Sequence, residues 1–444
     1  MMVDADNITS SAVQRTRTEI EPGRRIAVVG SGIGGLSAAW LLAQKYQITL
    51  FEAGDYFGGH SNTVNVTLEG ITHPVDTGFL VHNDLTYPNL VPLLAHLSVP
   101  VHASEMSFGV SLQKPDLEWA GTDLSTVFAQ PLNFFRPRFL RMLYDILRFN
   151  REAERYLAEA RVAPITLGAL LKREKYAQAM QDWYLLPMAA AIWSTPVSAV
   201  LDFSAETFLA FCLNHRLLQI KDRPQWKTIL GGSQVYVRAM LARMSDARLA
   251  CPVTQVRRSA ESVQITSSRG VEQFDAVVMA CHAPTTLALL DATPVERQVL
   301  SAFHVQANEA VLHTDVALLP RRSKVWSAWN YMSVGGQGGA SPVAVSYWIN
   351  QLQPLPFKTP VIVTLNPHQD PDPDKVLARF SYAHPVLDQA ASRAQISLPM
   401  LQGQQRTWFC GAWTGYGFHE DGLKSGLRVA RDFGVTPPWQ AMYD

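Results

Sequence analysis

The chain has 444 residues, of which 47% are hydrophobic, 10% aromatic and 17% charged. This composition is typical of a globular protein with a large core, and it excludes a disordered or low-complexity chain. Lysine plus arginine and aspartate plus glutamate both number 38, so the formal net charge is zero. No overall charge therefore favours nucleic acid as a partner, and none is expected.

The cysteines and the beginning of the sequence indicate a compartment. The four cysteines are far apart and form no CxxC pair, so we expect neither a metal site nor a disulfide framework. Residues 1–23 are polar and are expected to form a disordered tail. No apolar run reaches the roughly 18 residues of a membrane-spanning helix. A cytoplasmic protein is the expectation.

A strand, a glycine turn, a helix and a second strand follow the tail in order. The apolar run 25–29 predicts a strand, residues 34–45 predict a helix, and 48–53 predict the next strand. The turn contains GxGxxG, in which the second glycine lets the backbone approach a diphosphate and the helix N-terminus faces it. The residues expected at the nucleotide are Gly30, Ser31, Gly32, Ile33, Gly34 and Gly35.

Glu52 lies at the end of the second predicted strand. Its carboxylate can accept hydrogen bonds from both ribose hydroxyls of an adenosine, each contributing about 1.5–3 kcal/mol. The same charge repels a 2′-phosphate, which disfavours NADP. The alternative is a structural glycine turn with Glu52 on a solvated strand end.

The order of elements predicts an α/β fold: a Rossmann-like dinucleotide-binding domain with an inserted mixed α+β substrate domain. Predicted strands and helices alternate in three separated segments, and long helices and aromatic loops lie between these segments. We therefore predict a nucleotide-binding domain from 24–65, 225–290 and 401–444. The substrate domain is predicted from 66–224 and 291–400.

The block Gly58-Gly59-His60, six residues after Glu52, resembles the second fingerprint of the superfamily of flavin amine oxidases, phytoene desaturases and protoporphyrinogen oxidases. The resemblance implies that the dinucleotide is FAD rather than NAD. The superfamily usually has arginine where this chain has His60. Because histidine lacks the permanent charge and the bidentate fork of arginine, we expect weaker or pH-dependent FAD retention.

Later segments extend the resemblance. A second glycine pair at 231–232, Val253 and the strand at 275–280 match superfamily segments in order. The C-terminal run 409–426 matches a strand, a glycine loop and a final helix whose N-terminus would face the flavin and stabilise negative charge on it. A surface helix with a capping acid pair is the alternative. The resemblance implies non-covalent FAD and these further contacts: Val253, Gly411, Ala412, Glu420, Asp421, Gly422 and Leu423.

The chain departs from the superfamily pattern at the positions that amine oxidases use to oxidise amines. Amine oxidases of the superfamily generally have a lysine beside the flavin, and no lysine occurs between Lys227 and Lys324. Phe418 stands where tyrosine is common. From their expected proximity to the flavin edge we predict three candidate bases, His419, Glu309 and His313, and a substrate pocket lined by Trp413, Tyr416 and Phe418.

The blocks 312–315, 329–331, 365–367, 382–385 and 415–422 most resemble a bacterial branch of predicted NAD/FAD-binding proteins. Genes of that branch often neighbour those of cyclopropane-fatty-acid-synthase-like enzymes. The resemblance implies an FAD-dependent oxidoreductase that removes a hydride from a C–H bond of a lipophilic substrate, a fatty-acyl chain in a desaturase-like reaction. An FAD-dependent amine oxidase and a non-catalytic flavin-binding accessory protein of lipid modification remain as alternatives.

Residues 131–151 carry five arginines against one acid, interleaved with phenylalanine and leucine. Such a helix can lie at the headgroups of an anionic membrane, so peripheral contact with the inner membrane face is one expectation. An amphipathic helix with an apolar core stripe and solvated arginines is the other. The sequence leaves the oligomeric state open.

Overall fold

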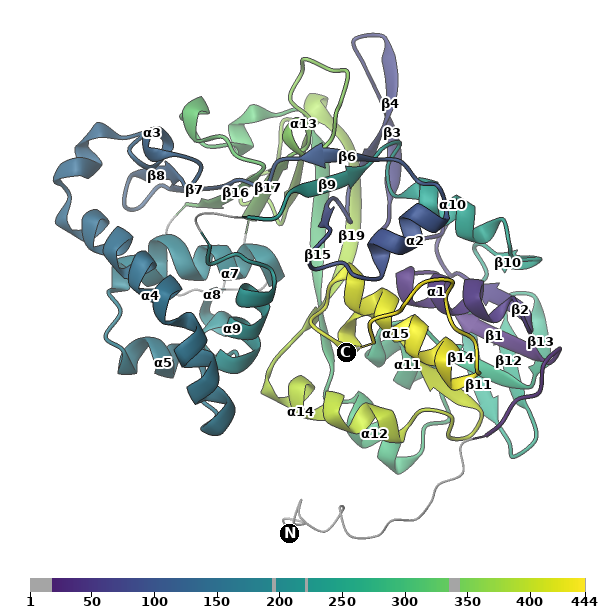
Figure 1. Ribbon diagram of the computed structural model, residues 1–444. Helices are drawn as coiled ribbons and strands as arrows, with labels where there is room; N and C mark the ends of the chain where they lie inside the picture. The colour runs from purple at the N-terminus through teal and green to yellow at the C-terminus, as the bar shows by residue number, and fades with distance from the viewer. Residues whose placement is uncertain (1–17, 194–196, 220–222, 335–343, 444) are drawn as a thin grey trace.

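The computed structural model describes residues 18–193, 197–219, 223–334 and 344–443. Most of the tail predicted at 1–23, namely residues 1–17, lies outside this described part. Figure 1 shows one group of helices on the left and a layered α/β unit on the right. Two long strands, β15 (His304–His313) and β19 (Val376–Val386), run between these two parts.

A five-stranded parallel sheet forms the centre of the α/β unit. Its strand order is β10 (Asp246–Arg248), β2 (Gln47–Phe51), β1 (Arg25–Val29), β14 (Ala276–Met279) and β20 (Thr407–Phe409). All five strands are short, and all except the edge strand β10 are mainly apolar, as expected for a sheet covered on both faces. The strands predicted at 25–29, 48–53 and 275–280 are confirmed to within a few residues.

Alternate residues of β1 face different layers. Ile26 and Val28 pack against α1 (Ile33–Leu42), α10 (Gln234–Leu241) and α15 (His419–Asp432), whereas Ala27 and Val29 belong to the opposite core. That opposite core contains an antiparallel sheet of β11 (Val253–Arg258), β12 (Val263–Ser267) and β13 (Gly270–Phe274). The α/β fold class with a Rossmann-like sheet is therefore confirmed.

Hydrophobic packing shifts the expected domain boundaries. Helix α2 (Leu90–His96) packs into the core on the α1 side of the sheet. Helices α12 (Pro294–Leu300) and α14 (Gln389–Ser397) pack into the opposite core, next to α11 (Ala283–Leu289). These helices fall within 66–224 and 291–400, the segments that the sequence assigned to the substrate domain, and they pack against the cores on the two sides of the parallel sheet.

The remaining unit combines a seven-stranded sheet with helices. The sheet has the order β19, β15, β18 (Ile362–Leu365), β17 (Ala344–Trp348), β16 (Trp329–Ser333), β7 (Phe108–Leu112) and β8 (Leu117–Ala120). Its helices are α3 (Leu124–Val127), α4 (Pro137–Val162), α5 (Leu167–Arg173), α6 (Gln178–Met180), α7 (Leu186–Trp193), α8 (Val197–Val200), α9 (Ala205–Asn214) and α13 (Ile349–Leu352).

Two small sheets complete the fold. β3 (Thr63–Leu68) and β4 (Ile71–Asp76) form a hairpin, and β5 (His82–Asn83), β9 (Trp226–Ile229) and β6 (Val101–Ser104) form a three-stranded sheet. No helix in the described part of the chain has both the length and the apolar character needed to span a membrane.

Candidate active site

A cavity of about 1020 Å³ joins the two units. At one end it is lined by the glycine turn after β1 and by the residues that follow β14 and β20. At the other end it is lined by residues of α3, α4, α7 and α9. The carboxyl ends of parallel strands form the usual ligand-binding edge of such a sheet. The cavity therefore combines a nucleotide-type edge with a wall supplied by the helical unit.

Two glycine turns lie side by side at the nucleotide end. Gly32 precedes the first residue of α1, and a Cβ atom built on it would meet no atom within 4 Å. A Cβ atom on Gly59 would lie 3.2 Å from the Gly32 Cα atom. Gly58 and Gly59 have φ values of +117° and +59°, a region that favours glycine. An open cradle therefore lies directly in front of the α1 N-terminus.

Glu52 is held in place at this cradle. Its carboxylate accepts hydrogen bonds from the backbone N–H groups of Ser31 at 3.0 Å and Gly54 at 2.8 Å, and from the Ser31 hydroxyl. The Ser31 Oγ atom in turn accepts from the Gly58 N–H at 3.1 Å, which connects the two glycine turns. A carboxylate oriented in this way at the end of β2 is suited to ribose hydroxyls.

Most of the predicted nucleotide contacts line the cavity. They are Gly30, Ser31, Gly32, Ile33, Gly34, Glu52, Gly58, Gly59, His60, Gly411 and Ala412. Gly35 does not line the cavity, because it faces β1: a Cβ atom there would lie 2.0 Å from the Gly30 carbonyl oxygen. This is the close helix-to-strand packing expected of the third glycine.

The acidic pair at the start of α15 has a different role from the predicted one. The Glu420 carboxylate accepts from the N–H groups of Asn89 at 2.9 Å and Leu90 at 3.0 Å, so it caps α2. Asp421 accepts from the Phe418 N–H at 3.0 Å and caps its own helix. Burial raises the pKa of Glu420 to about 7 and of Asp421 to about 6. Neither carboxylate lines the cavity.

Three further predicted cofactor contacts are also packing residues. Gly422 packs against Ile33, Leu423 is buried in the core beside α1, and Val253 lies in the opposite core. The cavity side of the α15 N-terminus is formed instead by Phe418 and His419. The predicted approach of this helix to the cavity is therefore found, but through the residues before Glu420.

Of the three predicted bases, only His419 lines the cavity. Its ring stacks on Phe79 with centroids 3.8 Å apart, and its Nε2 atom lies 3.0 Å from the Tyr236 hydroxyl. Burial lowers the pKa of His419 to about 3. The ring is therefore neutral at physiological pH.

Glu309 and His313 are not at the cavity, so their prediction as bases does not fit the geometry. Both lie on β15. Glu309 is half exposed and forms an ion pair with Arg379 at 2.6 Å. His313 is fully buried, bonds to the Thr364 hydroxyl at 2.8 Å and accepts from the Asp315 N–H at 3.0 Å. Their position on the strand could not be inferred without the sheet register.

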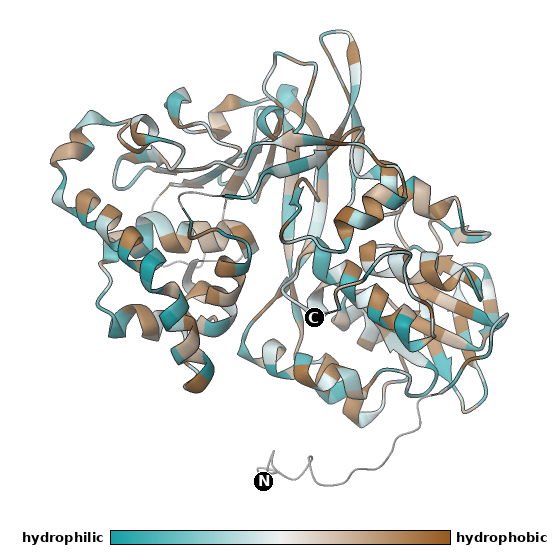
Figure 2. Ribbon diagram, in the orientation of Figure 1, coloured by the Kyte–Doolittle hydropathy of each residue, from teal (hydrophilic) through white to brown (hydrophobic). Residues whose placement is uncertain are grey.

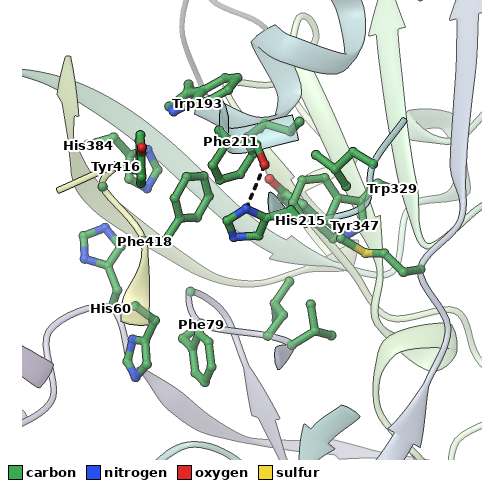
Figure 3. Close-up of a pocket in the computed structure, with 18 of the residues that line it drawn as sticks. His60, Phe79, Trp193, Phe211, His215, Trp329, Tyr347, His384, Tyr416 and Phe418 are labelled. Carbon is green, nitrogen blue, oxygen red and sulfur yellow. Dashed lines mark hydrogen bonds between the residues drawn. The ribbon is translucent and has the colours of Figure 1, made fainter. Parts of the chain in front are cut away.

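The predicted substrate residues Trp413, Tyr416 and Phe418 all line the cavity. Phe418 stacks on Phe211 of α9 with centroids 4.5 Å apart, and Trp193 lies 4.7 Å from Phe211 (Figure 3). Trp413 is nearly buried and donates its indole N–H to the Cys281 carbonyl at 3.1 Å, so packing is a large part of its role. The wall beyond the nucleotide end is therefore aromatic.

Two histidines, His60 and His384, line the cavity (Figure 3). The His60 ring stacks on Tyr382 at 5.0 Å and lies 5.1 Å from His384. Its Nε2 atom is buried without a hydrogen-bond partner among the described residues. Burial and the neighbouring histidines hold the pKa of His60 well below its usual value. His60 therefore offers an unsatisfied polar atom at the cavity, but no charge.

A chain of hydrogen bonds fixes the tautomer of His384. The Glu309 backbone N–H donates to Asn366 Oδ1 at 3.0 Å, and Asn366 Nδ2 donates to Asn308 Oδ1 at 2.7 Å. Asn308 Nδ2 then faces His384 Nδ1 at 2.9 Å. Because the donor in this last contact is an amide NH₂, Nδ1 is the acceptor and the neutral ring carries its proton on Nε2. His384 is thus an N–H donor at the cavity.

Sequence reasoning missed several lining residues. Residues 280–282 directly follow β14, and the carboxyl-edge rule could have found them. Trp329, Tyr382 and His384 lie in blocks that resemble the bacterial branch, but sequence reasoning assigned them no role at the site. No local signal marks a further group, which reaches the cavity only through tertiary packing: Phe79, Phe211, His215, Trp226 and Tyr347.

The sheet, the two adjacent glycine turns and Glu52 together define a protein that binds a dinucleotide along the carboxyl edge of the sheet. The sequence model described as flavin-containing amine oxidoreductase matches residues 33–433. The chain belongs to this family and is a flavin-dependent oxidoreductase with FAD as its cofactor. Comparison with curated protein sequences gives no match.

Solved structures show the same fold at low sequence identity. Putrescine oxidase bound to putrescine has a TM-score of 0.66 and 15% identity, over 93% of this chain and 99% of that one. The conjugated-linoleic-acid-producing fatty acid isomerase from P. acnes has a TM-score of 0.67 and 14% identity, over 94% and 100%. Cyclohexylamine oxidase from Brevibacterium oxydans IH-35A has a TM-score of 0.66 and 14% identity, over 93% and 99%.

The residues present fit FAD. The cradle at Gly32 and Gly59 has no side chain to exclude a diphosphate, and the α1 N-terminus faces it with unsatisfied N–H groups. Glu52 is positioned for the ribose, and the cavity continues toward Ala412 and Phe418 with room for a ring system. His60 Nε2 is an orphaned polar atom that a ligand at the cavity could satisfy.

Proposed function

We propose that the protein removes a hydride from a C–H bond of a lipophilic substrate, with a fatty-acyl chain as the substrate class. The observation that carries this proposal is the lining of the cavity. Among the described lining residues the carboxylates are Glu52 and Asp123. Glu52 belongs to the nucleotide end, and Asp123 caps the short helix α3 by accepting from the Thr126 N–H at 2.9 Å.

An apolar chain fits such a lining better than a diamine does. A buried ammonium group requires a nearby opposite charge, because desolvation of an unpaired charge is costly. The part of the cavity around Phe418, Phe211 and Tyr347 offers no carboxylate among its described residues. Solved proteins of this fold include both putrescine oxidase and a fatty acid isomerase, so the fold is compatible with a fatty-acyl chain.

Amine oxidation is the second candidate. Its supporting observation is the stacked pair Phe211 and Phe418, with Trp193 beside it. Aromatic faces attract ammonium groups by about 0.5–2 kcal/mol. This attraction does not require a carboxylate, but it is smaller than the cost of an unpaired buried ammonium group.

FAD, when bound, supplies the acceptor for two electrons transferred as a hydride. The residues of the chain would bind and orient the substrate and handle the proton. We propose His419 as the proton acceptor, because it is the one of the three candidate bases that lines the cavity. Loss of a hydride and a proton from adjacent carbons would leave an alkene, and turnover would require molecular oxygen or another electron acceptor. The aromatic wall around Phe418 would exclude water.

Anaerobic mixing of the holoprotein with candidate substrates tests this proposal. We expect oleic acid or a phospholipid extract to bleach the absorption band of the oxidised flavin at about 450 nm, and putrescine and cyclohexylamine to leave this band unchanged. Bleaching by the amines alone would establish the second candidate. No bleaching by either class would contradict both, and would favour a non-catalytic accessory protein.

A matched pair of variants tests the proton acceptor. His419→Ala is expected to slow flavin reduction by the lipid about 100-fold, the lower end of typical general-base contributions. Glu309→Gln is the control, since Glu309 is exposed and outside the cavity. An unchanged rate in His419→Ala would remove this side chain from the mechanism.

A further inference from the structure

The helical unit has an exposed apolar surface on α3, α4 and the 3₁₀ helix η2 (Pro131–Phe135), here called the α3–α4 surface. Phe135 is 83% exposed and Leu124 is 78% exposed. Figure 2 shows brown, hydrophobic segments on α3 and on the adjoining start of α4. The exposed apolar members of this surface are Leu124, Leu132, Phe134, Phe135, Leu140, Tyr144 and Leu147.

Helix α4 is apolar on two faces in its first half. Phe139, Met142 and Phe149 are buried in the core. Leu140, Tyr144 and Leu147 follow the helical spacing i, i+4 and i+7 on the opposite, solvent-exposed face. Farther along, this exposed face continues with charged residues, namely Arg151, Glu154 and Arg155. A surface helix normally needs one apolar stripe, so the second stripe requires a separate explanation.

Positive charge accompanies this second stripe. Asp145, the one acid in 131–151, is buried between Arg141 and Arg148, at 3.0 and 3.2 Å. Arg138 lies over the Trp183 ring and has no carboxylate partner among the described residues. The neighbouring acids are also engaged, since Asp116 pairs with Arg321 and Asp123 caps α3. Arg138 and Arg141 are exposed in the first turns of α4, next to the apolar side chains of η2, whereas Arg151 pairs with Glu152.

The cavity extends to the α3–α4 surface. Leu124 and Leu147 are largely exposed, and both also line the cavity. Val127, Phe128 and Leu143 line it as well, together with the polar Thr122, Asp123 and Asn150. The cavity lining supplied by α3 and α4 is therefore mainly apolar, and part of it is exposed.

We infer that the α3–α4 surface docks on an anionic lipid bilayer, with the exposed part of the cavity lining facing the lipid. Exposed phenylalanine and leucine side chains insert at the headgroup boundary, and arginines add electrostatic attraction to anionic headgroups. The inference rests on the proposed function in one respect: a lipophilic substrate would enter the cavity from the bilayer without crossing water. Charge and the exposed apolar lining favour this occupant over a second copy of the chain.

Vesicle sedimentation of the holoprotein tests the inference without any turnover, so its outcome is separate from that of the proposed function. We expect binding to vesicles containing phosphatidylglycerol, weaker binding to pure phosphatidylcholine, and a decrease with added salt. No binding to the anionic vesicles would overturn the inference. So would a concentration-dependent dimer without vesicle binding, since a second copy would then cover the surface.

A double variant and a matched control locate the contact. Leu132→Ser with Phe135→Ser is expected to lower the vesicle partition coefficient about tenfold or more, because two inserted side chains are lost. Ile396→Ser on α14, where the native side chain is 80% exposed, should leave it unchanged. The flavin spectrum shows whether each variant is folded. Full vesicle binding by a folded double variant would overturn the inference.

Discussion

Glu52 connects the cofactor site to the local geometry of the chain. It accepts from Gly54, two residues later, and from Ser31 in the first glycine turn, 21 residues earlier, so its orientation is set within one strand–helix–strand unit. The charge also orients the backbone that forms the cradle. Residues of this kind, including the glycines of the first turn, could be predicted from spacing alone.

Replacement of this charge should weaken cofactor binding. Glu52→Gln is expected to raise the FAD dissociation constant about tenfold, because a charge-assisted hydrogen bond contributes about 1.5–3 kcal/mol. Fluorescence titration of the deflavinated protein measures it, with Glu309→Gln as a control that keeps the native value. Equal affinity of Glu52→Gln and the native protein would show that Glu52 does not contact the nucleotide.

His384 illustrates what sequence could not predict. Its tautomer depends on Asn308 and Asn366, which lie on other strands of the seven-stranded sheet or just after them. The carboxylate of Glu420 is a similar case, since its partner Asn89 lies 331 residues away in the sequence. Such roles follow from strand register and helix packing, and neither is encoded in a local motif.

The N–H group that His384 offers at the cavity gives a second prediction about a single residue. Asn308→Ala removes the amide that holds Nδ1, and His384→Ala removes the donor itself. Both variants are expected to slow flavin reduction, and His384→Ala, which removes the donor itself, by more than Asn308→Ala. Stopped-flow absorbance measures the rates. If Asn308→Ala kept the native rate while His384→Ala did not, the hydrogen-bond chain would have no positioning role.

At the scale of elements, the contact between α1 and α15 determines the shape of the cofactor site. A Cβ atom on Gly426 would lie 2.0 Å from the Ser37 hydroxyl oxygen and 2.4 Å from the Gly34 carbonyl oxygen. The two helices approach this closely because glycine occupies the contact. Their N-terminal ends therefore face the cavity from neighbouring positions, and Ile33 and Phe418 both line it.

An added methyl group should separate these helices. Gly426→Ala is expected to lower the free energy of unfolding by about 3 kcal/mol, in the upper range for overpacked sites, and to reduce the FAD content. Gly121→Ala is the matched control, since a Cβ atom there meets nothing within 4 Å, and we expect a change within about 0.5 kcal/mol. Thermal unfolding measures both. A native melting temperature for Gly426→Ala would contradict the close contact.

The elements differ in how far sequence could predict them. Strands β1, β2 and β14 are short, strongly patterned apolar segments, and their prediction is confirmed. The seven-stranded sheet was not predicted as a unit, because it pairs β7 with β16, more than 200 residues later. Long-range pairing of this kind leaves no periodic signal in either strand.

For the whole molecule, buried histidines make stability depend on pH. Burial lowers the pKa of four histidines to about 4 and the pKa of a fifth to about 3, whereas a histidine in the unfolded chain has a pKa of about 6.5. Between pH 4 and 6.5 the unfolded state therefore binds more protons, so each of these residues costs stability as the pH falls. They are His82, His215, His313 and His384, with His419 the lowest.

Three buried acids act in the opposite direction. Burial raises the pKa of Asp76 and Asp421 to about 6 and of Glu420 to about 7, so in the folded state they bind protons that the unfolded state releases. Five histidines outweigh three acids, and we expect the melting temperature to fall from pH 7.5 to pH 5 at saturating FAD. Differential scanning calorimetry measures it. A higher melting temperature at pH 5 would contradict burial of the histidines in neutral form.

Release of the flavin from the purified protein shows which cofactor the chain binds and how it is held. FAD is expected on the cradle in front of α1, extending toward the start of α15. The native protein should show the absorption bands of an oxidised flavin, and acid precipitation should release intact FAD into the supernatant because no covalent bond holds it. A colourless protein that also fails to take up added FAD would contradict the account.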